Sequence, residues 1–424
     1  MRQHFTWRRT AGRLLGLAAL VVLLYLVLAP TGRYLVRAAW EEGKILAGRR
    51  SIAALVEDPG TPPEVRAKLR LVLAARAFAR DSIDLRTRQS FTTYTRLQHD
   101  TLVLVLSAAY RDRLESYTWW FPVVGRVPYK GYFDFRAARA AARQLEAHGY
   151  DVYLRPSAAF STLGWFNDPL VSTTLRADSL DLANTVIHEL THNTFYAPGQ
   201  AVFNESFANF VGARGSAWFF RARHERDAAD EEDARWEDDK LMARFWERLR
   251  RSIDSAYAVY PGEGSAHVKM RISARDTVYA RARLELVYGL GPRLRTIGPR
   301  VLERMRLDNA TLLARRIYLT DLDLFDGVWT RQGGDLRKTT ACIIELARSR
   351  PKDPYGALRQ WLARTPAPEA QLPPNRPLNS ARMSMAGTGG ASGAAAGAGS
   401  SPNTNRCILA RTPLSTNRVS WSIE

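Results

Sequence analysis

Cysteine and histidine are scarce in this sequence of 424 residues. Only two cysteines occur, Cys342 and Cys407, which excludes a disulfide-rich framework, and neither lies in a zinc-ligand pattern. The seven histidines make a chance pair at ligand spacing uncommon. No internal repeat is evident, so we do not expect a repeat array.

Acidic residues are in deficit relative to basic ones. Arginine and lysine number 61 against 42 aspartates and glutamates, which gives a formal charge of +19. The basic residues are scattered along amphipathic stretches, and no basic motif is interleaved with aromatic residues, so nucleic-acid binding is not expected. An anionic membrane surface is the partner that this charge favours.

Long uncharged runs are absent except near the N-terminus. Residues 14–32 carry no charge, and as one helix they would be roughly 28 Å long, enough to span a bilayer. A cleaved signal peptide is the alternative, with residues 27–29 as the cleavage site, but Pro30 directly after the cut disfavours it. We therefore expect residues 1–33 to form a transmembrane anchor.

The charges around this run indicate its orientation. Four arginines precede it, whereas two arginines and a lysine, interrupted by two glutamates, follow it. The positive-inside rule then places the short N-terminal end in the cytoplasm. The bulk of the protein is expected on the periplasmic or extracytoplasmic side of a bacterial inner membrane.

A metal-binding pattern lies near the middle of the chain. His188 and His192 are four residues apart, so on a helix both imidazoles point to one side and can bind one ion. Apolar residues recur at helical spacing through 180–190, which predicts that helix. Glu189 would sit beside an open coordination position as a general base. The pattern is typical of a zinc hydrolase.

A third ligand is expected from the next helix. Catalytic zinc takes three protein ligands and leaves the fourth position for water, and Glu205 is the natural third ligand. If one helix ends near Tyr196 and the next begins near Asn204, the residues between them span at most roughly 23 Å. Packed helix axes are only about 8–10 Å apart, so the loop can close.

These residues resemble the gluzincin metallopeptidases, in which an H-E-x-x-H helix precedes a helix with an N-E-x-x-A segment that supplies the zinc-binding glutamate. Residues 188–192 and 204–208 match the two motifs. The spacer at 193–204 is shorter than in usual gluzincins. The resemblance implies a zincin-like catalytic domain with a small sheet, an active-site helix and a glutamate helix.

A wider resemblance runs from about residue 35 to about residue 360. Four further segments resemble a family of bacterial zinc aminopeptidases, namely residues 121–125, 129–133, 161–173 and 333–336. This resemblance implies Zn²⁺ as the cofactor and a peptide or protein as the substrate. It indicates the fold and the site better than the substrate.

Further site residues follow from the resemblance. Asn209, one turn after Glu205, stands where related enzymes often carry a residue that orients the first histidine, although a surface amide is an equal alternative. Tyr318 is the first candidate for a hydrogen-bond donor to the tetrahedral oxyanion, and His267 is the second. Ordinary packing or surface positions are the alternative for both.

A substrate-binding strand is expected just before the helix that carries His188 and His192, called the metal helix below. Residues 159–167 would form an edge strand to which an extended peptide can add, with Gly164 and Trp165 in contact with it. The glycine and the aromatic residues of this segment could equally serve a tight turn and the core. Asp168 is a candidate for capturing a free amino terminus, although Asp-Pro also starts turns.

Periodicity along the whole chain predicts an α+β, mainly helical fold. Strand patterns at 100–107, 125–133 and 150–155 flank a helix that Asp134 can cap, and later segments are helical. Residues 230–233 are expected on a solvated helix surface, with a calcium site as a weaker alternative. The expected parts are a transmembrane anchor (1–33), a helical stalk or cap (34–98), a zincin-like metallopeptidase domain (99–362) and a disordered low-complexity tail (363–424).

The sequence therefore predicts a membrane-anchored zinc peptidase, an aminopeptidase by resemblance. One alternative is a zinc endopeptidase acting on membrane-proximal or misfolded proteins. Another is a non-catalytic, membrane-anchored scaffold with structural zinc. Structural zinc sites usually close with a fourth protein ligand, so three ligands beside Glu189 favour catalysis. The oligomeric state is not indicated.

Overall fold

The computed structural model describes residues 2–97, 101–122, 125–157 and 169–366. Helices predominate in this part of the chain and small sheets complete it, which confirms the predicted α+β, mainly helical class. The longer helices are α1 (Arg2–Leu28), α2 (Pro30–Ala47), α3 (Ile52–Glu57), α4 (Pro63–Phe78), α5 (Phe135–Ala147), α6 (Ser179–Thr194), α7 (Ala201–Ala222), α8 (Arg226–Ala258), α9 (Ser265–Leu284), α10 (Pro299–Arg304), α11 (Asn309–Arg316), α12 (Leu322–Arg331), α13 (Leu336–Ser349) and α14 (Pro354–Arg364).

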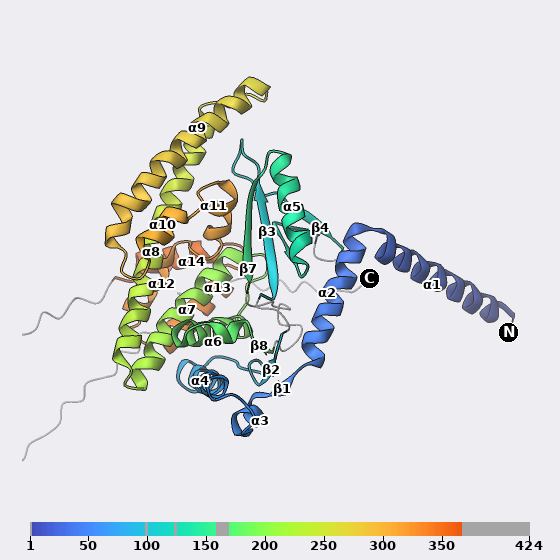
Figure 1. Ribbon diagram of the computed structural model, residues 1–424, viewed down its shortest axis with the longest axis horizontal. Coiled ribbons are helices and arrows are strands. Elements are labelled where there is room, and N and C mark those ends of the chain that lie inside the picture. Colours follow the sequence, from blue (N-terminus) through green and yellow to red (C-terminus); the bar gives the residue numbers. More distant parts are fainter. Residues whose placement is uncertain (1, 98–100, 123–124, 158–168, 367–424) are drawn as a thin grey trace, which may run out of the picture.

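The main sheet has three antiparallel strands in the order β6-β3-β7, which are β6 (Tyr129–Tyr132), β3 (Val103–Ala109) and β7 (Asp151–Ser157). Helices α5 and α11 pack against it (Figure 1). In the register, Ser107 pairs with Tyr129 and Val105 pairs with Arg155. Because alternate residues of a strand share a face, Tyr129 and Arg155 lie on the same face of the sheet.

The other strands are short. A hairpin joins β4 (Trp119–Phe121) to β5 (Gly125–Val127). A third sheet has the order β1-β2-β8, with β1 (Arg50–Ser51), β2 (Thr93–Thr95) and β8 (Leu170–Val171). Strand β8 precedes α6 in the chain, so this sheet leads directly into the metal helix.

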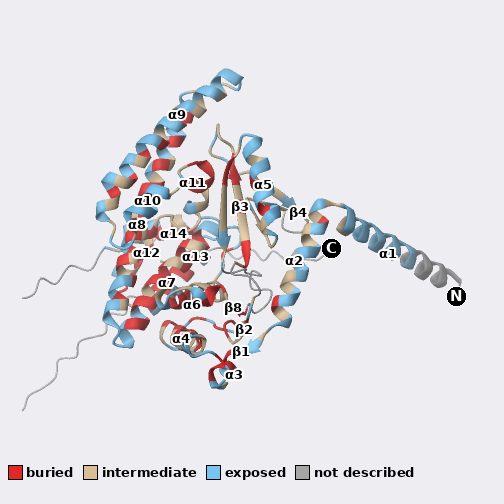
Figure 2. Cartoon of the chain, in the orientation of Figure 1, coloured by how far each residue is buried: buried red, intermediate tan, exposed pale blue. Residues whose placement is uncertain are grey.

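The largest hydrophobic core surrounds α6 and α7, whose buried residues are red in Figure 2. Helix α4 packs on one side of α6, and α7 packs on another. Leu69 and Val72 of α4 belong to the same buried cluster as Val186 and Ile187 of α6. The segment 34–98 therefore contributes to the core that fixes the metal helix, and its separation from 99–362 as a stalk or cap stays a prediction.

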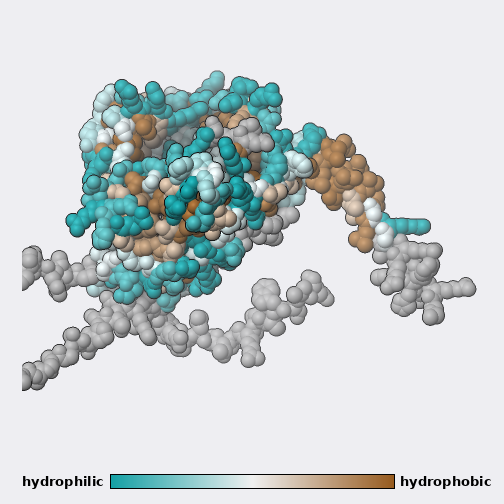
Figure 3. All heavy atoms as spheres, turned by 60° about the horizontal axis from the view of Figure 1, so that its bottom comes forward, coloured by the Kyte–Doolittle hydropathy of each residue, from teal (hydrophilic) through white to brown (hydrophobic). Residues whose placement is uncertain are grey.

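Helix α1 projects away from the body, and its apolar side chains form the brown arm in Figure 3. The prediction of one continuous helix over 14–32 is wrong, because the chain breaks before Pro30 and the two helices meet at 88°. Proline lacks the backbone N–H and fits the first position of a new helix. Within the described residues, no single helix is both long and apolar enough to cross a bilayer, although the bent pair of α1 and α2 meets that test jointly.

Candidate metal centre

Helix α6 holds the two histidines at a fixed spacing. Its N-terminus is capped by Asp178, whose carboxylate accepts a hydrogen bond from the Asp181 N–H at 2.8 Å. His188 and His192 lie on a partly exposed side, one turn apart. The helix is anchored by the buried side chains of Leu182, Ala183, Val186, Ile187 and Leu190.

The short loop between α6 and α7 is closed by one side chain. The Asn204 amide donates to the Ala197 carbonyl and accepts from the Ala197 N–H, both at 2.8 Å. Gly199 has a φ of 73°, which the turn requires and glycine adopts readily. These contacts set the start of α7 and therefore the position of Glu205, one residue after Asn204.

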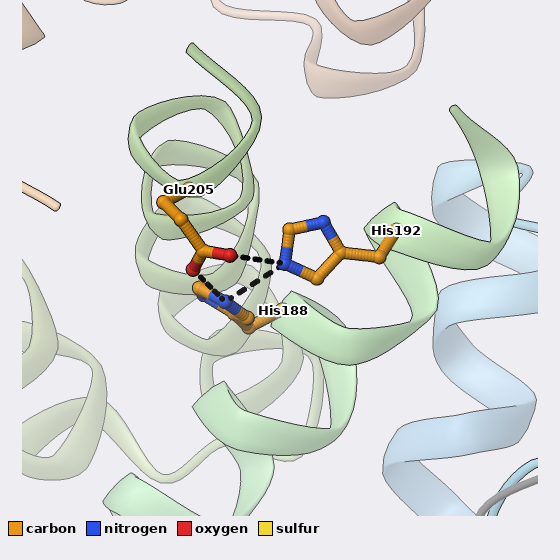
Figure 4. A group of neighbouring side chains, drawn as sticks. All are labelled: His188, His192 and Glu205. Atoms are coloured by element: carbon orange, nitrogen blue, oxygen red, sulfur yellow. Dashed lines mark hydrogen bonds and ion pairs between the residues drawn. The ribbon is translucent and has the colours of Figure 1, made fainter. Parts of the chain in front are cut away.

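Three side chains converge where α6 crosses α7 (Figure 4). The Nε2 atoms of His188 and His192 are 3.2 Å apart. Nε2 of His188 is 3.5 Å from Oε2 of Glu205, and Nε2 of His192 is 3.6 Å from Oε1. All three ligand atoms lie within 4.8 Å of one another. The structure thus brings together the three residues that were predicted as metal ligands.

Two glycines of α7 allow this close approach. A Cβ atom on Gly212 would lie 2.6 Å from Oδ1 of Asn184 and 3.3 Å from Cβ of His188. A Cβ atom on Gly215 would lie 2.9 Å from the side chain of Ile187. Contacts below 3 Å are too short for carbon, so any larger residue would push the two helices apart. Neither glycine was among the residues predicted to form the site.

Burial and charge act in opposite directions on the site. Burial alone would raise the pKa of Glu205, but the hydrogen bonds and charges of the two histidines outweigh it and lower the pKa to about 2. For His188, burial would lower the pKa, but Glu205, Glu189 and a hydrogen bond with Asn209 raise it. The cluster therefore favours an ionised carboxylate next to imidazoles.

Glu189 follows the first histidine on α6 and is half-buried. Its negative charge contributes to the raised pKa of His188, which places the carboxylate near the ligand group. Among the described residues, its carboxylate has no hydrogen-bond or ion-pair partner.

Asn209 and Tyr318 lie beside the three candidate ligands. The side-chain amide of Asn209 donates to the Tyr318 carbonyl at 2.9 Å, besides its hydrogen bond with His188. Burial raises the pKa of the Tyr318 hydroxyl, and the negative charge of Glu205 adds to this shift. Tyr318 therefore stays protonated near neutral pH and can donate a hydrogen bond. His267 is exposed in the first turn of α9 and is not part of the ligand group.

Two further polar residues near the site, Tyr129 and Arg155, were not among the predicted site residues. Tyr129 has a raised pKa caused first by burial and then by the charge of Glu205. The guanidinium carbon of Arg155 lies 5.9 Å from the Tyr318 ring centroid. Both come from the main sheet, so only strand pairing reveals that they face the site. Their segments offered one hint, since Tyr129 begins one of the stretches that resemble the aminopeptidase family.

Glu232 corrects the expectation that residues 230–233 are solvated. Its side chain is 1% exposed, accepts a hydrogen bond from the Asn184 amide at 3.0 Å, and also accepts one from the Ser216 hydroxyl. Asn184 lies one turn before His188 on α6. The charge pattern of α8 could not show this burial, because the partners come from α6 and α7.

Three predicted substrate-binding residues, Gly164, Trp165 and Asp168, lie outside the described residues, as does the predicted edge strand 159–167. Their roles stay predictions. Residues 363–366 of the predicted tail are described, and the rest of that tail is not.

The donor set fits a zinc ion. Zinc binds imidazole nitrogen and carboxylate oxygen, and a catalytic site uses three such ligands. Within the part of the chain that the structure describes, the group consists of His188, His192 and Glu205 without a fourth histidine, cysteine or carboxylate ligand. This composition resembles a catalytic site more than a closed structural one.

A comparison with protein families gives one match. The family model described as "Putative aminopeptidase" covers residues 33–357, which is more than half of the chain. No curated protein and no solved structure gives a significant match.

Proposed function

The chain belongs to the family described as "Putative aminopeptidase", and on that premise we propose that it is a zinc-dependent peptidase of the gluzincin type. The observation that carries the proposal is the convergence of His188, His192 and Glu205, with their ligand atoms within 4.8 Å of one another. The two imidazoles come from one helix and the carboxylate from the next, which is the order of the gluzincin motifs. An aminopeptidase is the form that the family description supports.

The proposed chemistry uses the residues around this group. His188, His192 and Glu205 would hold the metal. A zinc ion bound there would act as a Lewis acid, which would polarise the substrate carbonyl and lower the pKa of water enough for it to lose a proton near neutral pH. Glu189 accepts that proton on a carboxylate oxygen as the water oxygen attacks the carbonyl carbon. When the peptide C–N bond breaks, Glu189 returns the proton to the departing amine nitrogen.

Tyr318 is proposed as the donor to the carbonyl oxygen that becomes negatively charged during the attack. Its raised pKa keeps the hydroxyl protonated, and Asn209 and Ser206 of α7 bind its backbone carbonyl at 2.9 and 3.3 Å. These hydrogen bonds attach Tyr318 to the helix that carries Glu205. Asn209 is proposed to position both His188 and Tyr318.

We propose further that α1 anchors the protein to a membrane, with the body on the periplasmic or extracytoplasmic side of an inner membrane. The supporting observation is exposure, since apolar side chains such as Leu14, Leu15 and Leu28 of α1 are more than half exposed. Exposed apolar surface of this extent is costly in water and is typical of contact with lipid or with another protein.

The experiment that tests the proposed activity offers the purified, zinc-loaded protein a peptide library in two forms, with free and with acetylated amino termini. Mass spectrometry of the products identifies the cleaved bonds. Single residues released from free amino termini alone would support an aminopeptidase. Internal cleavage of both forms would instead indicate the endopeptidase alternative. If zinc is bound and neither form is cleaved, the site is structural and the peptidase proposal is wrong.

A further inference from the structure

A cavity of about 190 Å³ lies between α11 and the main sheet. Its wall consists mainly of apolar side chains from three parts of the chain, namely Pro128, Val202, Ala310, Leu313, Ala314 and Ile317. Ser107 and Ala108 of β3 complete the sheet side. None of the three candidate metal ligands, His188, His192 and Glu205, lines the cavity.

The cavity lies next to the proposed catalytic residues. Pro128 directly precedes Tyr129, and Ile317 directly precedes Tyr318. Val202 is three residues before Glu205 on α7, so the two share one side of that helix. Along the chain, each of three walls therefore contains a residue within one position or one helical turn of Tyr129, Tyr318 or Glu205.

Hydrogen bonds attach one wall of the cavity to α7. The backbone N–H of Thr320, a lining residue, donates to the Ser206 hydroxyl oxygen at 3.3 Å. Ser206 follows Glu205 in the chain, and Asn209 donates to the Tyr318 carbonyl at 2.9 Å. The stretch from Ile317 to Thr320 thus connects the cavity to α7, the helix that carries Glu205. These hydrogen bonds hold this wall of the cavity against α7.

Two polar side chains of the wall, those of Arg316 and Thr320, already have partners. The guanidinium of Arg316 lies 3.3 Å from the carboxylate of Glu247, and the hydroxyl of Thr320 donates to the Arg316 carbonyl at 2.6 Å. A cationic substrate group would meet the positive charge of Arg316. An anionic group would have to compete with Glu247 and lose its hydration in an apolar wall, which is costly.

We propose that this cavity receives the side chain of a substrate residue next to the scissile bond and selects an uncharged aliphatic residue of medium size, such as leucine or methionine. The inference rests on the proposed peptidase function and adds the substrate class. An aliphatic side chain removes apolar surface from water on both sides of the contact, whereas glycine leaves the cavity unfilled and a charged side chain is desolvated there.

The test uses the full, zinc-loaded chain and peptides that differ only at the residues flanking the bond that the wild type cleaves. Ala314→Leu places extra methyl groups in the cavity, and Ile317→Ala enlarges it. Arg315→Leu is the matched control, because it adds a leucine at the neighbouring, exposed position of α11 that does not line the cavity. The readout is kcat/KM for glycine, alanine, leucine, phenylalanine, aspartate and lysine at the varied position.

We expect the wild type and Arg315→Leu to prefer leucine over aspartate and lysine by about tenfold or more. Ala314→Leu should lose about tenfold on leucine peptides and little on alanine peptides, and Ile317→Ala should shift the preference towards phenylalanine. A wild-type preference for charged residues would overturn the inference. The inference would also be overturned if the folded variants had the same substrate preferences as the wild type. If Ala314→Leu does not fold, the result for Ile317→Ala decides. Absence of any wild-type cleavage overturns the peptidase proposal instead, and the inference with it.

Discussion

The Glu205 carboxylate has a pKa of about 2 although its environment is largely buried. Burial raises the pKa of a carboxyl group, so the low value requires partners that favour the charged form. His188 and His192 are those partners, at 3.5 and 3.6 Å. Metal ligation needs an ionised carboxylate, and this environment provides one. His188 and His192 on α6 thus keep the Glu205 carboxylate on α7 ionised.

Replacing Glu189 separates metal binding from proton transfer. Glu189→Gln keeps the size of the side chain and removes its ability to accept a proton, so we expect bound zinc to stay near the wild-type amount. Peptide hydrolysis should fall about 100-fold to 10,000-fold. Elemental analysis and product formation measured on the same preparation check both statements. Hydrolysis at the wild-type rate would exclude Glu189 as the general base.

Asp239 predicts a pH effect on stability that is independent of the metal centre. Burial, and then repulsion from Asp238, raises the pKa of Asp239 to about 7 in the folded state. The folded state then binds a proton that the unfolded state has lost between about pH 4 and pH 7. The contribution of Asp239 to the free energy of unfolding is therefore present at low pH and is lost as the pH rises towards 7.

Asp239→Asn should weaken this fall in stability, because asparagine does not titrate. Thermal unfolding of the wild type and of the variant, measured from pH 4 to pH 8, checks the prediction. Asp230→Asn is a suitable control on the same helix, since the side chain of Asp230 is exposed. Equal pH profiles of the Asp239 variant and the wild type would contradict the proposed role of burial.

Part of the site could be predicted from local sequence. The spacing of His188 and His192 fixes their relative positions because a helix has a regular period. Tyr129 and Arg155 could not be found in this way, because their approach to the site depends on the pairing of strands distant in sequence. The proximity of Glu205 depended on a loop whose closure by Asn204 and Ala197 is visible only in three dimensions.

At the scale of elements, the crossing of α6 and α7 determines the site. Gly212 and Gly215 let the two helices approach, and buried side chains on both helices fill the core around the crossing. Glu232 of α8 adds a buried hydrogen bond to Asn184 behind the first histidine. The position of the imidazoles therefore depends on packing between three helices, α6, α7 and α8.

Gly212→Ala tests this dependence. The added methyl group would lie 2.6 Å from Oδ1 of Asn184, so the helices must shift, at a cost of about 1–3 kcal/mol in unfolding free energy. We also expect weaker zinc binding, because Cβ of His188 would be only 3.3 Å away. Gly43→Ala is the control, since it lies in α2 with nothing within 4 Å of the added atom. Thermal unfolding and zinc titration of both variants give the answer, and equal stability of the two would exclude tight α6–α7 packing.

The elements differed in how well sequence predicted them. Helix α13 lies among the later segments expected to be helical, and Asp134 caps α5 by accepting hydrogen bonds from the N–H groups of residues 136 and 137, as expected. Local signals suffice where a cap and a periodic apolar face coincide. Helices α12 and α14 have short apolar patterns, whose bounds become interpretable only when the two helices pack on α13 and on each other. The break before Pro30 was missed because the apolar composition continues across it.

At the scale of the whole molecule, the body and α1 differ in surface. The body has a mainly hydrophilic surface, whereas α1 extends an apolar helix away from it (Figure 3). The contact between α2 and the rest of the protein includes Tyr34, whose ring lies 5.5 Å from that of Phe121. The anchor proposed for residues 1–33 can therefore be removed without taking away this contact.

Deletion of residues 1–33 should release the protein from membranes and leave peptide hydrolysis within about threefold of the full chain, because the ligand group and its core are retained. Fractionation of cells that express either the full chain or the shortened form, followed by a high-salt wash, measures how much of each form stays with the membranes. Recovery of the shortened protein in the membrane pellet after that wash would contradict an anchor confined to the N-terminus.

The most direct measurement of the central claim is the zinc content of the purified protein, determined by elemental analysis for the wild type, for His188→Ala and for His224→Ala as a control at an exposed histidine. If His188, His192 and Glu205 hold one ion, the wild type and the control contain about one zinc per chain and His188→Ala contains almost none. One zinc per chain in His188→Ala, or none in the wild type after exposure to zinc, would contradict the metal centre.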